Sequence, residues 1–287
     1  MTITDSLAAA LAAYRAADLT AASAHVEAAA EAGSLLAAEL RTYLGGETAG
    51  PVYEQPRAFT TFIRGGGNVE LYRRLSAELA ARYDAQQPKA LLDLGCGDGL
   101  AVVPALAQAR HSPMRVDLVE PSGALLEAAR RRLVREVHTW EATAQSFLGH
   151  ENPRWDLTQS TFALQSIPPA ERAGVLRVLR PRTAKLVIAE FDVPEYVEGS
   201  PEHLRSLVTR YERGVAEYGT DASLVAQGFL LPVLLGLVTA KERTNWEHPA
   251  ATWVTQLTEA GYTDVEVEPL ADYWWSPAVL VTATGRG

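Results

Sequence analysis

One short segment, KALLDLGCGDGL at residues 89–100, constrains the fold more than any other part of the sequence. Its apolar run is typical of a buried β-strand, and the run stops at Asp93. Three glycines follow at every second position, Gly95, Gly97 and Gly99, and glycine adopts main-chain conformations that other residues avoid. A glycine-rich turn between a strand and a helix can bind a dinucleotide pyrophosphate, or can let an adenosyl sulfonium cofactor lie against bare main chain. The segment therefore predicts an α/β protein with a nucleotide-derived cofactor.

The apolar pattern divides the chain into three parts. Residues 1–60 are rich in alanine, and glycine breaks predict about three helices there. From residue 89 onward short apolar runs alternate with helical segments, which predicts a parallel sheet with crossover helices. The expected strands cover residues 90–94, 116–119, 137–140, 156–159, 186–189, 263–267 and 278–284, with His138 packed in the third. We expect an N-terminal helical cap at 1–68, a cofactor-binding core at 69–193 and 246–287, and at 194–245 a helical insertion that covers the substrate site.

Composition excludes several classes of protein. A formal net charge of −9 argues against binding nucleic acid by neutralising phosphates, and the arginines at 130–132 read as a solvated helix face beside Glu127. Cys96 is the single cysteine, which excludes an internal disulfide and a cysteine-built zinc site; we expect no metal and a reducing cytoplasm. The N-terminus lacks the basic start of a signal peptide. The longest apolar run, residues 228–238, is shorter than the ~20 residues of a membrane span, so we expect a buried helix and no membrane association.

The glycine spacing favours the adenosyl cofactor over the dinucleotide. The motif is Asp-x-Gly-x-Gly-x-Gly over residues 93–99, which departs by one residue from the G-x-G-x-x-G turn of dinucleotide-binding proteins. The helix expected from about residue 100 points its amino end at the turn. Glu120 follows Gly99 by twenty-one positions, at the end of the second strand, where its carboxylate can accept from both hydroxyls of a ribose.

With these residues the sequence resembles the class I S-adenosylmethionine-dependent methyltransferases, from about residue 62 to residue 284 and most closely in LLDLGCGDG and VDLVEPS. The resemblance implies a seven-stranded Rossmann-like sheet of order 3-2-1-4-5-7-6 with the seventh strand antiparallel. It also implies that Asp93 and the main chain of 95–97 hold the methionine part, Glu120 the ribose, Glu141 and Ala142 the adenine, and that residues 160–162 pass beside the sulfonium. Glu141 can alternatively be a helix N-terminal charge without a ligand.

The candidate cofactor-binding residues form one set. Arg64 lies beside a triple glycine, where it can bind the cofactor carboxylate or remain a solvated surface arginine, and Gly67 is proposed with it. The full set is Arg64, Gly67, Asp93, Gly95, Cys96, Gly97, Glu120, Pro121, Glu141, Ala142, Ser160, Thr161 and Gln165.

The sequence defines the methyl acceptor less closely than it defines the cofactor. The segments FIRGGGN, STFALQSI and YWWSPAVLVTATG are similar to bacterial secondary-metabolism methyltransferases, including some that methylate C3 of an indole in tryptophan-containing diketopiperazines. The sequence after the fourth strand lacks the Asn-Pro-Pro-Tyr type of motif found in enzymes that methylate DNA amino groups. We therefore expect a small aromatic natural product, with Phe162, Gln165, Phe191, Trp274 and Trp275 as substrate-binding residues; packing at a domain corner is the equal alternative for the tryptophans. A second copy of the chain, as a homodimer, is the candidate protein partner.

Methyl transfer from a sulfonium depends mainly on alignment and on exclusion of water, so a base is optional. Residues 165–166 are Gln and Ser where many relatives carry histidines, which excludes a histidine base at that place. Candidates elsewhere are Glu190, Tyr14, His25 and Tyr211, and for each of them taken alone the sequence favours a structural role over a catalytic one. The alternatives are an O- or N-methyltransferase of a phenol, carboxylate or amine, a non-methylating binder of S-adenosylmethionine or a cyclase, and an NAD-dependent oxidoreductase, which the glycine spacing disfavours.

Overall fold

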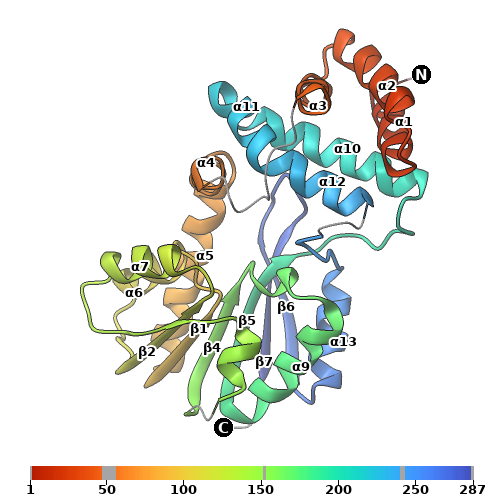
Figure 1. Ribbon diagram of the computed structural model, residues 1–287. Coiled ribbons are helices and arrows are strands. Elements are labelled where there is room, and N and C mark those ends of the chain that lie inside the picture. The colour runs from red at the N-terminus through yellow and green to blue at the C-terminus, as the bar shows by residue number, and fades with distance from the viewer. Residues whose placement is uncertain (1, 47–55, 151–152, 240–242, 286–287) are drawn as a thin grey trace. The chain divides into compact units, whose positions relative to one another are not determined.

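A computed structural model describes residues 2–46, 56–150, 153–239 and 243–285. The chain forms two compact units (Figure 1). The helical unit consists of Met1–Val69, Glu195–Asn245 and Tyr273–Ser276, and the sheet unit consists of Glu70–Pro194, Trp246–Asp272 and Pro277–Gly287. Each unit is therefore assembled from segments that are distant in sequence.

The sheet unit contains one seven-stranded sheet of order β3-β2-β1-β4-β5-β7-β6. The part β2-β1-β4-β5-β7 can be followed in Figure 1. Its strands are β1 (Ala90–Leu94), β2 (Arg115–Glu120), β3 (His138–Glu141), β4 (Trp155–Thr161), β5 (Thr183–Phe191), β6 (Thr263–Ala271) and β7 (Ala278–Thr284). All neighbouring pairs are parallel except the two that β7 makes with β5 and β6. The expected strand order and the antiparallel seventh strand are confirmed.

Helices cover both faces of this sheet. They are α5 (Asn68–Gln86), α6 (Val102–Gln108), α7 (Gly123–Arg132), α8 (Ala144–Leu148), α9 (Pro169–Leu179) and α13 (Ala250–Glu259). Side chains of α8, α9 and α13 share one buried core with Leu92 and Leu94 of β1. Because successive side chains of a strand point to opposite faces, Asp93 faces the other layer. There Tyr83 of α5 donates its hydroxyl to Gln159 Oε1 on β4 at 2.5 Å, and Gln159 is the register partner of Asp93.

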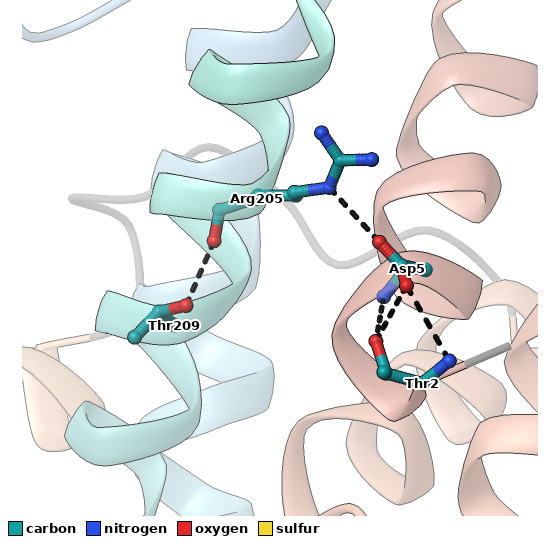
Figure 2. A network of polar contacts seen from close by, with 4 residues as sticks. All are labelled: Thr2, Asp5, Arg205 and Thr209. Carbon is teal, nitrogen blue, oxygen red and sulfur yellow. Dashed lines mark hydrogen bonds and ion pairs between the residues drawn. The ribbon is translucent and has the colours of Figure 1, made fainter.

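The helical unit contains α1 (Ile3–Arg15), α2 (Leu19–Glu31), α3 (Leu35–Gly45), α4 (Pro56–Arg64), α10 (Pro201–Ala216), α11 (Ala222–Val225) and α12 (Leu231–Thr239). Helix α1 begins with a capping box, in which Thr2 Oγ1 accepts from the Asp5 amide and the Asp5 carboxylate accepts from the Thr2 amide. The other carboxylate oxygen of Asp5 accepts from Arg205 Nε on α10 at 2.9 Å (Figure 2). One acidic residue thus caps a helix and joins it to a segment two hundred positions away.

A second carboxylate joins the cap to the insertion. Glu212 of α10 accepts from the Ser34 hydroxyl at 2.6 Å and from the Leu35 and Leu36 amides at 2.8 and 3.1 Å. These are amides of the first turn of α3, which no residue within α3 can satisfy. Met1–Val69 and Glu195–Asn245 thus belong to one compact unit, although the sheet-unit segment Glu70–Pro194 separates them in the sequence.

The apolar run at residues 228–238 lies in a π-helical turn, Ala226–Leu230, and in α12, and most of its side chains are buried, as expected. Within the described residues, Gly219–Thr239 is long and apolar enough to cross a membrane, and 61% of that window is buried inside the structure. Buried core helices of globular proteins share this length and composition.

Several local expectations differ from the structure. Helix α4 is not predicted by the pattern, and it places Arg64 at the end of a helix. His138 does not pack in the sheet, because β3 is an edge strand and all four of its residues are exposed. Arg130 and Arg131 pair with Glu127 on an exposed face of α7, as expected.

Candidate cofactor and acceptor sites

The turn after β1 is fixed by main-chain hydrogen bonds to the neighbouring strand. The amides of Gly95 and Cys96 both donate to the carbonyl of Val119 on β2, at 2.8 and 3.1 Å. Gly95, Gly97 and Gly99 have φ angles of +73°, +54° and +77°, a region that side-chain-bearing residues avoid. The turn therefore needs glycine at all three positions for conformation alone.

The surroundings of the three glycines differ. A Cβ atom on Gly95 would collide with Cβ of Ala163, and one on Gly99 would lie 2.6 Å from Cγ2 of Val103. A Cβ atom on Gly97 would meet nothing within 4 Å. Gly95 and Gly99 are thus required for packing inside the protein, whereas Gly97 faces open space that a ligand can occupy.

Glu120 lies beside Gly97 at the end of β2. Its Oε2 accepts from the Gly97 amide and its Oε1 from the Ser122 amide, both at 3.0 Å. Burial raises the pKa of Glu120, and these two amides oppose the rise. Each oxygen keeps one lone pair, so the carboxylate can accept two further donors. A pair of ribose hydroxyls fits this donor requirement.

Asp93 at the end of β1 is 1% exposed, and neither of its carboxylate oxygens has a hydrogen-bond partner within the described residues. Burial raises the pKa of Asp93 to about 7, the nearby amide of Gln159 opposes the rise, and Glu120 adds to it. A buried carboxylate without donors is costly, and a ligand that brings N–H donors would satisfy it. Burial also raises the pKa of the Cys96 thiol, which leaves it protonated and unreactive at neutral pH.

The residues that follow β2 and β3 lie close together, beside Glu120 at the carboxyl ends of these strands. A Cβ atom on Gly123, the first residue of α7, would lie 2.6 Å from Oε2 of Glu141, and the Ala142 amide donates to the Glu120 carbonyl at 3.3 Å. Pro121 and Glu141 are exposed, and Ala142 is half-buried. The exposed Glu141 carboxylate is thus held near a helix N-terminus, an arrangement that fits both interpretations of this residue.

The loop after β4 carries an aromatic cluster. Phe162 has φ +55°, and its amide donates to the Ala189 carbonyl of β5 at 2.8 Å. Its ring stacks on Phe191 with centroids 4.7 Å apart and meets Tyr72 of α5 edge-on at 5.9 Å. Ser160 is buried and donates its hydroxyl to the Leu94 carbonyl at 2.8 Å, so its side chain joins β4 to β1; Thr161 beside it is half-buried.

Glu190 of β5 and Gln165, which follows this loop, are joined by a hydrogen bond. The Gln165 amide donates to Glu190 Oε1 at 3.1 Å, and Glu190 is completely buried. Burial raises the pKa of Glu190 to about 8, while the Gln165 amide and the charge of Arg172 oppose the rise. The sheet unit therefore brings together the cofactor candidates from 93 to 165 with Phe162, Phe191 and Glu190.

The remaining candidates belong to the helical unit: Tyr14, His25, Arg64, Gly67, Tyr211, Trp274 and Trp275. Tyr14 and His25 are half-buried on α1 and α2, and Arg64 ends α4. Gly67 donates its amide to Glu217 Oε2 at 2.7 Å, so that donor is already used within the unit.

The two tryptophans and Tyr211 pack against one another. Trp274 stacks on Trp275 at 5.5 Å and meets Tyr211 edge-on at 5.6 Å. The three side chains are 0–4% exposed, and a Cβ atom on Gly214 would lie 2.7 Å from the Trp274 ring. These aromatics contribute to the core of the helical unit, which supports the packing interpretation given above as an alternative.

Sequence reasoning missed several residues that shape the sheet-unit site. Tyr72, Ala163 and Arg172 contact the Gly95 turn or the Phe162 loop, and Tyr83 and Gln159 lie beside Asp93. Period-two alternation along β4 could have placed Gln159 on the same face as Asp93, because the two strands are neighbours. No local signal marks the other four.

Residues 91–182 match the protein-family model described as a methyltransferase domain. The matched segment is about a third of the chain and lies within the sheet unit. A trans-aconitate 2-methyltransferase of Methylobacterium radiotolerans is 37% identical over 95 residues, which are 33% of this chain and 35% of that protein. The aligned part is thus about a third of the curated relative.

Solved methyltransferases share the fold over longer stretches. The mitomycin 7-O-methyltransferase has a TM-score of 0.53 at 16% identity and covers 94% of this chain and 71% of its own. The magnesium protoporphyrin IX methyltransferase of Synechocystis, with bound S-adenosylhomocysteine, has a TM-score of 0.51 at 12% identity. The match covers 87% of this chain and 94% of that protein. An O-methyltransferase-like protein of Nostoc punctiforme has a TM-score of 0.50 at 15% identity, covering 73% of this chain and 55% of that protein.

Proposed function

We propose that this protein transfers a methyl group from S-adenosylmethionine to a small aromatic molecule. The observation that carries the proposal is the pair formed by Gly97, whose free side faces open space, and Glu120, whose half-satisfied carboxylate adjoins it. Both lie within the segment that matches the methyltransferase domain. The Gly97 amide already donates to Glu120 Oε2 and is not available to a pyrophosphate at this turn, which disfavours a dinucleotide.

The chain's own residues would hold the cofactor at three points. Glu120 would accept from the ribose hydroxyls, the main chain at Gly97 would face the methionine part, and Asp93 would accept from its ammonium group, as in the family that the sequence resembles. When bound, S-adenosylmethionine supplies a methyl group on a positively charged sulfur. The remaining work of the protein is to orient the acceptor and to exclude water.

The acceptor proposed is a flat aromatic natural product. The cluster of Phe162, Phe191 and Tyr72 at the carboxyl edge of the sheet supports this, because aromatic rings recognise flat apolar ligands by stacking. The specific proposal is C3 of an indole in a tryptophan-derived diketopiperazine. O-methylation of a phenol or acid is the second candidate, and the names of the mitomycin 7-O-methyltransferase and the Nostoc protein favour it.

An indole or phenol acceptor must finally lose a proton. Glu190 is the candidate base in the sheet unit, since burial raises its pKa to about 8 and so suits proton uptake near neutral pH. Tyr14, His25 and Tyr211 are candidates in the helical unit; burial raises the pKa of Tyr14, which makes it a weaker acid.

Calorimetry with S-adenosylhomocysteine tests the cofactor half of the proposal. We expect Glu120→Ala to weaken binding about tenfold or more, which corresponds to ~1.4 kcal/mol, because two hydroxyl partners are lost. Glu127→Gln on α7 is the matched control, since that carboxylate pairs with Arg130 and Arg131 on the surface. Equal affinity of wild type and Glu120→Ala would overturn the site.

A panel of acceptors tests the other half. Wild-type protein with S-adenosylmethionine is incubated with indole, phenol and carboxylate compounds, including a tryptophan-containing diketopiperazine, and products are identified by mass and NMR. A methyl group on indole C3 would support the specific proposal, and one on oxygen would support the second candidate. Cofactor binding without any methylated product would favour a non-methylating binder.

A further inference from the structure

The peptide group between Leu164 and Gln165 is held from both sides by buried titratable side chains. Its carbonyl accepts from Arg172 Nη1 of α9 at 3.2 Å, and its amide donates to Glu190 Oε1 of β5 at 3.1 Å. Arg172 and Glu190 are both 0% exposed. Two buried titratable side chains thus converge on one peptide in the 3₁₀ turn Leu164–Ser166 (η2), and both lie in the sheet unit.

Two further contacts fix the same turn. The Trp246 amide donates to the Gln165 carbonyl at 2.9 Å, and Arg172 Nε donates to Gln256 Oε1 of α13 at 2.9 Å. The Arg172 guanidinium also lies 4.3 Å from the centre of the Trp253 ring. Arg172 is thereby fixed to α13 on one side while it holds the Leu164 carbonyl on the other.

This turn begins two residues after Phe162, which is held in a left-handed conformation at φ +55°. A non-glycine residue pays a conformational cost there and remains left-handed only where its surroundings enforce it. In this conformation the Phe162 amide donates to the Ala189 carbonyl, and the Phe162 ring stacks on Phe191. The loop is thus anchored at two places, the Phe162 amide and the Leu164–Gln165 peptide.

We propose that Glu190 and Arg172 are positioning residues, which clamp the Leu164–Gln165 peptide and so hold Phe162 in its left-handed conformation with its ring stacked on Phe191. As a consequence they set the aromatic surface on which a flat acceptor would lie. The part of this role that concerns the acceptor rests on the proposed function. The clamp on the Leu164–Gln165 peptide does not, because it is present in the free protein. It also differs from proton transfer by Glu190, because a clamp needs a hydrogen-bond acceptor and not a base.

Paired substitutions at residue 162 test the clamp without cofactor or acceptor. Phe162→Gly and Phe162→Ala both remove the ring. Alanine still has an unfavourable conformational energy at positive φ, whereas glycine does not. We expect the glycine variant to unfold at a higher urea concentration than the alanine variant while Glu190 and Arg172 are present. In the Glu190→Ala or Arg172→Met background the loop can relax, so this difference should shrink or reverse. An unchanged difference would overturn the proposal.

Where Glu190→Ala or Arg172→Met fails to fold, Glu190→Gln decides. Its amide oxygen still accepts from Gln165, so the urea difference between glycine and alanine at residue 162 should match that of wild type, and loss of the difference would count against the clamp. Hydrogen exchange gives a local readout: in whichever clamp-breaking variant folds, residues 160–168 should exchange faster, and residues 90–100 should not. Uniformly faster exchange would point to a general loss of stability instead.

Turnover separates the clamp from a base and from the proposed function. With an acceptor that wild type methylates, Arg172→Met should raise the acceptor KM by about tenfold or more and leave S-adenosylhomocysteine affinity unchanged, because Arg172 is not among the residues proposed to bind the cofactor or to take up the proton. An unchanged acceptor KM in folded Arg172→Met would overturn the role of the clamp in acceptor binding. A large fall in kcat for Glu190→Gln at unchanged KM would assign proton transfer to Glu190 in addition to the clamp, because the glutamine still accepts from the Gln165 amide. Absence of S-adenosylhomocysteine binding by wild type would overturn the proposed function and would leave the urea experiment to judge the clamp.

Discussion

Two glycine-rich turns of this protein have nearly the same composition and different physical reasons for it. In the turn at residues 95–99, Gly97 faces open space and its amide is held by Glu120. In the turn at residues 65–67, a Cβ atom on any of the three glycines would meet another atom of the helical unit within 3.0 Å. The neighbours are the Thr61 carbonyl and Glu217 Oε2, with the rings of Tyr218 and Tyr273 just beyond.

The difference lies in what occupies the space that a side chain would need. In the second turn protein atoms occupy it, and the Gly67 amide is already bonded to Glu217, so the glycines serve packing. In the first turn only Gly95 and Gly99 serve packing, and Gly97 leaves a free surface. A glycine-rich motif indicates a ligand site only where such a free surface remains.

The largest effect is expected for Gly95→Ala, because it combines a positive φ with a collision. The new Cβ would overlap Cβ of Ala163, which is a main-chain-proximal atom that cannot rotate away. We expect a loss of unfolding free energy of about 2–5 kcal/mol in urea titrations, the sum of the left-handed cost and of overpacking. Gly95→Ala combined with Ala163→Gly should regain part of the loss; a double variant no more stable than the single one would contradict this account.

Asp93 extends the comparison to charge, since the first turn carries a buried carboxylate and the second does not. Burial raises the pKa of Asp93 to about 7 from a usual value of 3.8, so the folded protein holds a proton that the unfolded chain releases. The free protein should therefore lose stability as pH rises from about 4 to 7, by a few kcal/mol from this group.

Asp93→Asn should abolish that pH-dependent loss, because the amide does not ionise. Urea unfolding of both proteins at pH 5 and pH 8 measures it, and the variant should gain on wild type at the higher pH. Calorimetry should at the same time show weaker binding of S-adenosylhomocysteine by the variant, since the amide is a poorer partner for an ammonium group. Parallel pH profiles of wild type and variant would rule out the buried ionisation.

The sheet could be predicted from sequence because its signals are local and repeated. The runs at 90–94 and 278–284 match β1 and β7 residue for residue, and the other strands differ only at their ends. Strand β4 extends to Thr161 and strand β5 to Phe191. These polar or aromatic residues continue the strands because they pair with a neighbouring strand, and the sequence does not reveal that neighbour. Strand order came from a resemblance and not from the pattern.

The candidate site was predictable only where main chain and motif spacing define it. Glu120 was placed by its distance from the glycines, and the structure shows its carboxylate at the Gly97 amide. The clamp on residues 164–165 was not predictable, because arginine side chains are mostly exposed in proteins, whereas Arg172 is buried and contacts α13, far along the chain. For Trp274 and Trp275 the sequence left a cavity wall and packing at a domain corner equally open, and their burial against each other supports packing.

Gly66→Ala tests the second turn. Its φ is +50°, and the new Cβ would lie 2.9 Å from Glu217 Oε2 and 3.1 Å from the Tyr218 ring. Glu217 can move only by giving up its bond to the Gly67 amide, so we expect a loss of about 1–3 kcal/mol in urea unfolding. Affinity for S-adenosylhomocysteine should not change. A binding defect larger than the stability defect would place a ligand at this turn and remove the contrast between the two regions.

Gly97→Ala is the smallest change in stability and the sharpest test of the contrast. The new Cβ meets no atom within 4 Å, so only the φ of +54° is unfavourable, and the unfolded chain loses some entropy that offsets it. We expect about 1 kcal/mol lost in urea unfolding. The methyl group would nevertheless occupy the space proposed for the cofactor, and S-adenosylhomocysteine affinity should fall about tenfold or more, or ~1.4 kcal/mol. Gly66→Ala is the matched control with the opposite pattern, a larger stability loss and unchanged binding. If both variants lost stability and kept S-adenosylhomocysteine affinity, the cofactor would not occupy the open space at Gly97, and the contrast between the two turns would be wrong.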